Sequence, residues 1–307
     1  MTRFMGLIKR NLLVFFKDTQ TIVFSLMTSI IVFVLYLLFL RDTFVEAIES
    51  PLAELGELGS LVNRDDLEMF SNLTLLVGIL GSAIITVPFN CLTTIVKDRE
   101  KKIDYDILAT PISRWQIILA YFAASALSAV MITGIILGIG LLILGRMGDL
   151  HMDVATVLAA YGVLVLGAVS STALFMIVVL FFRSSSASGA FFGMLSAASG
   201  FVIGAYIPIS QFSGRVQTFC NLFPASHITI LFRNVLLNNV LDSVESSIGG
   251  LGQGAFSETI RQIFVFRAHL FGREFGRSGM LVYVLAMIAL CIVGMIILYC
   301  KTYKRKG

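Results

Sequence analysis

Six long apolar runs are the feature that most constrains how this chain can fold. A membrane-crossing helix needs about 20 mainly apolar residues. Runs of that kind lie at about 21–40, 71–95, 115–144, 154–182, 188–207 and 280–300. The backbone must satisfy its own hydrogen bonds inside lipid, so each run is predicted to be a transmembrane helix. The predicted fold class is therefore an all-α membrane protein with six transmembrane helices.

The composition agrees with this class and excludes several others. The 307 residues are 57% hydrophobic and only 14% charged, whereas soluble domains carry roughly 25% charge. The net charge of +4 comes from basic residues at the edges of the runs, with no nucleic-acid motif, so no nucleic-acid partner is predicted. The cysteines are scattered and lack metal-binding spacing, so neither a disulfide framework nor a metal site is predicted.

The distribution of Lys and Arg among the loops predicts how the chain is oriented in the membrane. They concentrate in 1–20, 96–114 and 301–307, whereas the 41–68 loop has two arginines against eight acidic residues. The positive-inside rule therefore places both termini and the 96–114 loop in the cytoplasm. We expect a multi-pass protein of the cytoplasmic membrane.

Residues 1–20 form an amphipathic pattern. Apolar side chains recur at helical spacing, and basic side chains are expected to snorkel from the other side. The pattern predicts an elbow helix on the cytoplasmic surface, which either anchors the chain or contacts a motor subunit. Its candidate residues are Phe4, Ile8, Lys9, Arg10 and Phe15.

Residues 97–114 separate two apolar runs and combine a charged segment with Thr-Pro-Ile-Ser-Arg. The charges predict a solvated helix, Pro111 is expected to end it, and Ser113 can cap the next span. The segment is either an ordinary loop or a coupling helix on which a soluble motor pushes. The candidate coupling residues are Lys97, Asp98, Arg99, Glu100, Lys101, Asp104, Asp106, Thr110, Pro111 and Arg114.

The outer region 208–279 is more varied. Residues 208–239 are too interrupted to span and too apolar for a free loop, which favours a re-entrant helical hairpin. Residues 240–256 are Gly/Ser-rich and expected to be flexible, and 257–271 suggest a surface-lying helix. Arg233 is expected to reach the outer interface or to pair internally. The candidate outer-gate residues are Phe219, Asn221, Phe223, Pro224 and Arg233.

Small residues recur in the fifth run at spacings that predict a single helix face. This face serves either ordinary helix packing or a pathway wall at a subunit interface. Its members are Gly189, Gly193, Ser196, Gly200 and Gly204.

Catalytic chemistry is not predicted. The sequence contains no phosphate-binding loop, and its three histidines, His151, His227 and His269, are isolated and expected to be solvated or interfacial. No activating base for a nucleophile is apparent inside the spans, so no catalytic residue is assigned. The apolar runs also lack the acidic and basic residues typical of ion-coupled pumps, which favours an energy source outside the membrane.

Two motifs carry a resemblance to a known family. Arg99-Glu100, Ile107-Leu108 and the 110–114 segment follow one another in the order typical of the ABC-2 family of transporter permeases, the membrane subunits of type V exporters. Asn221 to Pro224, followed by Arg233, is similar to the family's element after the fifth span. The first motif differs from the family pattern at residues 102–105.

The resemblance implies a permease subunit with an elbow at 1–20 and a transmembrane domain at 21–307, without a cofactor of its own. It would dimerise, as a homo- or heterodimer, and pair with two ABC ATPase subunits that bind ATP and Mg. Apolar spans favour export of a lipophilic or amphipathic compound: a drug (multidrug resistance), antimicrobial peptide, toxin or lipid. Alternatives are polysaccharide or lipid-linked glycan export, a motor-independent channel or scaffold, and, least favoured, an intramembrane enzyme.

Overall fold

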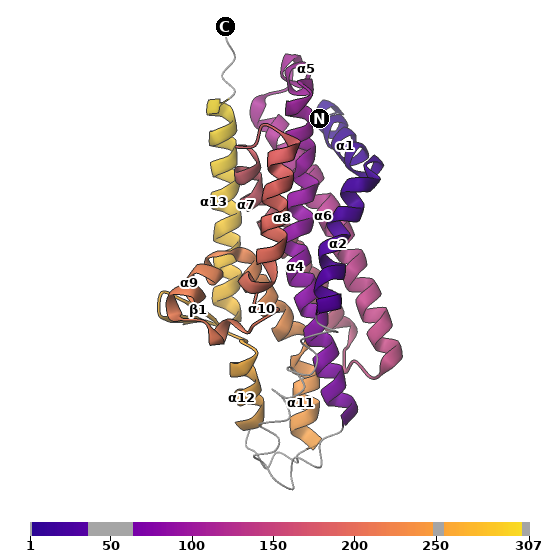
Figure 1. Cartoon of the computed structure of the whole chain (residues 1–307), viewed down its shortest axis with the longest axis vertical. Coiled ribbons are helices and arrows are strands. Elements are labelled where there is room, and N and C mark those ends of the chain that lie inside the picture. Colours follow the sequence, from indigo (N-terminus) through magenta and orange to yellow (C-terminus); the bar gives the residue numbers. More distant parts are fainter. Residues whose placement is uncertain (1, 36–63, 248–254, 303–307) are drawn as a thin grey trace.

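The computed structural model describes residues 2–35, 64–247 and 255–302. These residues form an elongated helical bundle (Figure 1). Its helices are α1 (Thr2–Lys17), α2 (Thr19–Leu35), α4 (Arg64–Glu100), α5 (Ile103–Ala109), α6 (Arg114–Met147), α7 (Val154–Val179), α8 (Ser185–Val202), α9 (Gly214–Leu222), α10 (Pro224–Leu236), α11 (Asn238–Ser247), α12 (Ala255–Ile263) and α13 (Arg277–Thr302). Helices α1 and α5 lie at one end, called the α5 end, and α11 and α12 lie at the opposite end.

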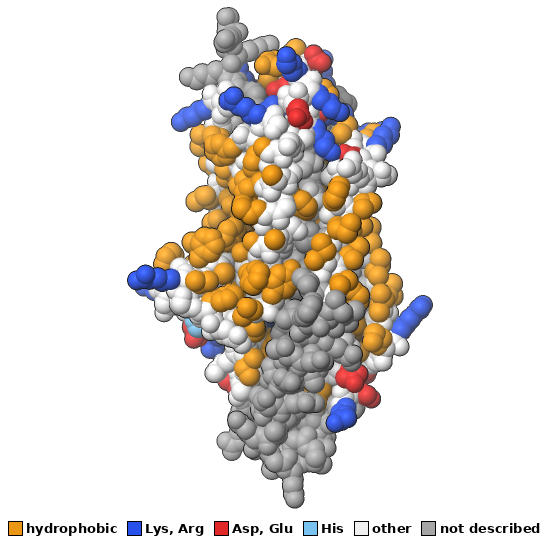
Figure 2. Space-filling view, in the orientation of Figure 1, with side chains coloured by type: hydrophobic (Ala, Val, Ile, Leu, Met, Phe, Trp, Pro, Cys, Tyr) orange, Lys and Arg blue, Asp and Glu red, His pale blue; other side chains and the backbone are white. Residues whose placement is uncertain are grey.

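Four of the described helices are long and apolar enough to cross a membrane: α4, α6, α7 and α13. The other two predicted spans coincide in part with α2 and α8, which do not meet the same criterion over their described residues. Part of the first predicted span, 36–40, lies outside the described residues. Figure 2 shows a band of hydrophobic side chains around the middle of the visible face, with Lys and Arg gathered at the α5 end.

Helix α4 is the centre of the bundle. Its 37 residues extend over about 55 Å at 1.5 Å per residue, which exceeds the hydrocarbon thickness of a bilayer. Side chains on nearly every side of it are buried, and it packs on α2, α6, α7, α8 and α10. At Gly81 the neighbours approach closely, because a side chain there would clash with Thr229 of α10 and with Ile203 after α8.

The segment from 208 to 279 corrects two predictions. Residues 240–247 of the segment predicted to be flexible (240–256) belong to α11, and 248–254 lie outside the described residues. The surface helix predicted at 257–271 ends at Ile263, and the chain then forms an antiparallel hairpin of β1 (Ala268–Leu270) and β2 (Arg273–Phe275). Phe271 and Gly272 both have positive φ, as the two-residue turn of such a hairpin requires.

The predicted small-residue face is also corrected. Helix α8 ends at Val202, and Gly204 lies beyond it with φ +68°, so the five residues do not share one helix. Gly200 is buried, and a side chain there would clash with the Tyr206 ring, whereas Gly189 and Gly193 are exposed and face open space. Of the predicted face, the part around Gly189 and Gly193 is therefore an exposed helix surface that no other described part of the chain covers.

Candidate functional site at the α5 end

The last four residues of α4 together contact several parts of the bundle. We call Lys97, Asp98, Arg99 and Glu100 the junction tetrad. Consecutive helical residues point in directions about 100° apart, so four in a row can reach the elements on all sides. Only Lys101 and Lys102 separate the tetrad from α5, so the tetrad connects α5 to the rest of the fold.

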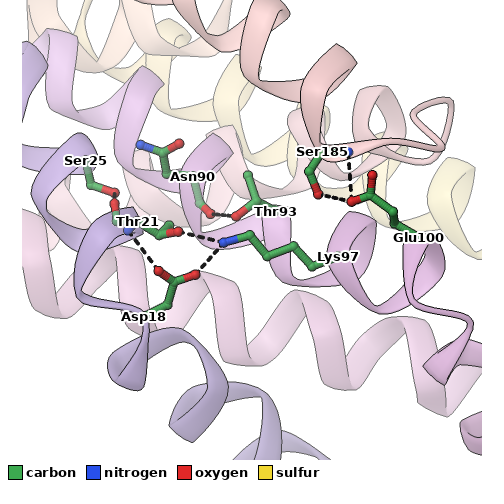
Figure 3. Close-up of polar contacts among 8 residues, drawn as sticks. All are labelled: Asp18, Thr21, Ser25, Asn90, Thr93, Lys97, Glu100 and Ser185. Carbon is green, nitrogen blue, oxygen red and sulfur yellow. Dashed lines mark hydrogen bonds and ion pairs between the residues drawn. The ribbon is translucent and has the colours of Figure 1, made fainter.

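Lys97 ties α4 to the start of α2. Its ammonium group forms an ion pair with Asp18 and donates a 2.9 Å hydrogen bond to the Thr21 hydroxyl (Figure 3). Burial raises the pKa of Asp18, but hydrogen bonds from Lys97 and Thr21 outweigh that effect and leave the pKa below the ordinary aspartate range. The Asp18 carboxylate therefore stays charged at neutral pH and holds the α1–α2 corner against α4.

Asp98 is the centre of a buried cluster. Its carboxylate forms a two-oxygen ion pair with Arg10 of α1, one contact being 2.7 Å, and accepts a 2.5 Å hydrogen bond from the Tyr121 hydroxyl of α6. The hydrogen bond to Asp98 raises the pKa of Arg10 above its ordinary value. Two predictions are corrected here: Asp98 is buried rather than solvated, and Arg10 binds Asp98 instead of snorkelling. An acidic side chain in a low-dielectric site requires such a partner.

Arg99 and Glu100 hold the connection between α7 and α8. Arg99 donates hydrogen bonds to the carbonyls of Leu180 (2.9 Å) and Phe182 (2.8 Å), at the end of α7. Glu100 accepts hydrogen bonds from the backbone N–H and the hydroxyl of Ser185, at the first residue of α8 (Figure 3). A carboxylate is favoured there because the first N–H groups of a helix lack internal partners.

Residues 97–114 are not one helix, which corrects the predicted boundary. Lys102 adopts a left-handed conformation (φ 61°), so α4 ends and α5 begins in a new direction. Lys101, Tyr105, Asp106, Thr110 and Pro111 are exposed, with Tyr105 67% exposed. Ser113 and Gln116 form a capping box at the start of α6.

A cleft of about 1330 Å³ adjoins α5. Its walls are α5, the 110–114 segment, the α7–α8 connection and the end of α13. The cleft is lined by more basic than acidic side chains. The basic ones are Arg99, Lys102, Arg114 and Arg183, and the acidic ones are Glu100 and Asp104. Burial raises the pKa of Asp104, and Arg99 only partly offsets this. The cleft is large enough to receive a protruding segment of another protein.

The elbow residues and the outer-gate residues lie apart from each other. Phe4, Ile8 and Phe15 pack on the core of the bundle and Lys9 is exposed. In the second group, Phe219 is exposed and its ring contacts Phe223 edge to face, and Pro224 begins α10. Asn221 is buried and donates to the His269 carbonyl at 2.8 Å. The two groups lie on different parts of the fold, and the elbow and gate roles stay predictions.

Two buried side chains of α10 can be compared with their sequence predictions. Arg233 donates to the backbone carbonyls of Ile203, Gly204, Phe264 and Val265, so it pairs internally, one of the two outcomes left open. His227 is buried, bonds the Asn221 carbonyl at 2.7 Å and stacks on Tyr283, which corrects its predicted exposure.

A bundle of apolar helices, with its charged side chains concentrated at the ends, defines a multi-pass membrane protein. The family model described as ABC-2 family transporter protein matches residues 63–300, and the chain belongs to this family. It is an ABC permease, a membrane transport domain of a generally non-catalytic kind that works with an ABC ATPase. No curated protein matches the chain in a sequence comparison.

Proposed function

We propose that the chain is the half-transporter of an ATP-driven exporter, in which two permease chains pair with two ABC ATPase subunits. ATP and Mg would bind to the ATPase. In the proposed topology the chain crosses the membrane six times, and both termini and α5 lie on the cytoplasmic side. The observation that carries the proposal is the junction tetrad: an exposed helix is joined, through four consecutive residues, to α1, α2, α6 and the α7–α8 connection.

This arrangement supports a specific route for the motor's movement. An ATPase that bound α5 differently in its two nucleotide states would shift the equilibrium between two permease conformations. Movement of α5 would displace the last turn of α4, and the tetrad would carry it to the elbow and to α8 together. The elbow and residues 97–114 thus act as one coupling unit.

The exposed side of α8 supports a second copy of the permease as partner. Ser186, Gly189, Ala190, Gly193 and Ala197 are exposed there. Small side chains allow two helices to approach closely in lipid, where no hydrophobic force drives association. The transport path would lie between the two chains, beside α4 and α8, with the α9–α10 hairpin re-entering the outer leaflet as its gate.

We propose a lipophilic or amphipathic cargo, such as a drug, antimicrobial peptide, toxin or lipid. Support comes from the apolar exposed faces of α2, α6 and α13. Glycan export is the alternative within the family, and a motor-independent channel is the alternative outside it.

Charge reversal on α5 tests this function. Asp106→Lys is expected to reduce permease-stimulated ATP turnover by about tenfold, because a misplaced charge at an interface costs over 1 kcal/mol. The matched control is Asp149→Lys, an exposed aspartate at the far end of α6, which should leave turnover unchanged. Equal turnover for wild type and both variants would favour a channel that needs no motor.

A further inference from the structure

A polar hollow of about 810 Å³ lies away from the α5 end. It is enclosed by α9, the α10–α11 junction, α12, the β-hairpin and the start of α13. Five carboxamide side chains line it, which is unusual for a protein dominated by apolar surfaces. They are Gln217, Asn221, Asn234, Asn238 and Gln262. We call this site the amide hollow.

Three arginines from separate segments enter the amide hollow, against two glutamates. Arg267 pairs with Glu274 at 3.4 Å and Arg261 with Asp242 at 3.3 Å, and both pairs are substantially exposed. Arg277 instead donates to the side-chain oxygen (3.0 Å) and the carbonyl (3.2 Å) of Asn234. Arg277 is exposed, and among the described residues no carboxylate forms an ion pair with it, so its charge is open to an anion from solution.

An exposed apolar surface, which we call the rim, lies on the other side of α9 and at the tip of the hairpin. Gln217 and Asn221 of α9 line the amide hollow, whereas Phe219 and Leu222 of the same helix are 58% and 43% exposed. The exposed Phe271 forms the tip of the hairpin. Figure 2 shows hydrophobic side chains and a basic group together on the bulge formed by α9 and the hairpin.

The position of α9 places this rim near the edge of the membrane. The Tyr283 hydroxyl of α13 donates to the Leu222 carbonyl at 2.8 Å. Tyr283 lies six residues after the start of α13, about 9 Å along the helix. Since α13 is one of the four apolar helices, α9 lies where its span begins, at the depth of lipid headgroups.

We propose that the amide hollow binds the anionic headgroup, a carboxylate or phosphate, of an amphipathic molecule whose apolar chain lies along α9. Guanidinium groups bind such oxyanions through two parallel hydrogen bonds. Gln217 and Asn234 each donate to two backbone carbonyls already, so donors for the remaining oxygens would come from Asn221, Asn238 and Gln262. Identifying this molecule as exported cargo rests on the proposed function. The binding itself does not, because it requires neither the ATPase nor nucleotide.

The test is equilibrium binding of labelled dodecyl phosphate to the full chain in nanodiscs of neutral lipid, corrected with empty nanodiscs. Arg277→Gln should weaken binding by about tenfold or more, as loss of a charge-assisted contact does. Glu274→Gln should tighten it by about threefold, because it releases Arg267 from its pair. Arg146→Gln, at an exposed arginine on the end of α6, is the control and should change nothing.

Two competitors separate the possible sources of the anion. Inorganic phosphate should compete at least about thirtyfold more weakly than dodecyl phosphate, because it lacks the chain that the rim would cover. Dodecyltrimethylammonium should not compete.

Unchanged affinity in Arg277→Gln, weaker binding in Glu274→Gln, or equal competition by inorganic phosphate would each overturn the proposal. If binding fails while Asp106→Lys still lowers ATP turnover, only the amide hollow is refuted. If binding holds while turnover is insensitive to Asp106, only the motor-coupled function is refuted.

Discussion

Asp98→Ala is expected to lower the free energy of unfolding by about 3 kcal/mol, the usual cost of removing one partner of a buried ion pair. The substitution leaves the Tyr121 hydroxyl buried without its acceptor and deprives Arg10 of its carboxylate. Helix α1 should also detach more readily, because Arg10 forms a polar contact between α1 and α4. Thermal and denaturant unfolding of the purified chain in detergent measures the first effect, and limited proteolysis of α1 measures the second.

A double-mutant cycle separates this pair from general damage. Arg10→Met alone leaves Asp98 buried without its cation, so the double variant should lose about 1–3 kcal/mol less than the sum of the two single losses. Lys9→Met, at an exposed neighbour on the same helix, is the control and should stay within about 0.5 kcal/mol of wild type. Strictly additive losses would show that Asp98 and Arg10 do not interact.

The second large effect is expected at Arg233. Arg233→Met removes the donors for four backbone carbonyls, two after α8 and two after α12. Each buried acceptor left without a donor costs about 1–3 kcal/mol, so we expect a loss of at least about 4 kcal/mol. Arg233→Lys keeps the charge but lacks the planar fork, and it should recover only part of that loss.

Size-exclusion chromatography and melting temperature measure this effect. Arg215→Met is the matched control, because Arg215 is exposed on the neighbouring helix α9 and its loss should be nearly neutral. If Arg233→Met melts within a few degrees of wild type, Arg233 does not hold the ends of α8 and α12 together.

Local sequence patterns predicted the long apolar helices well. The predicted runs at 115–144 and 280–300 correspond to α6 and α13, because length and hydropathy are properties of each segment by itself. The capping role of Ser113 was predicted for the same reason, since the capping box is formed within four residues. The same local patterns do not determine how many helices cross the membrane, because α8 is short and rich in serine and glycine.

The contacts of the candidate site depend on distant partners that no local pattern names. The local pattern predicts Asp98 to be one more charge in a solvated helix, because Arg10 lies 88 residues away in the sequence and Tyr121 lies in an apolar run. Asp18 and Ser185 were missed for the same reason. The turn at Lys102 was also missed, because lysine gives no signal for a left-handed conformation.

The most direct test of the motor-coupled account is cross-linking from α5. A photoreactive group is attached at Tyr105→Cys, in a chain whose partly exposed Cys300 is replaced by serine, after purification with the co-assembled ABC ATPase. The account predicts cross-links from position 105 to the ATPase, in a yield that changes when ATP is added. The control position, Met147→Cys, is 65% exposed at the other end of α6. No ATPase co-purifying, or equal yields from both positions, would contradict the account.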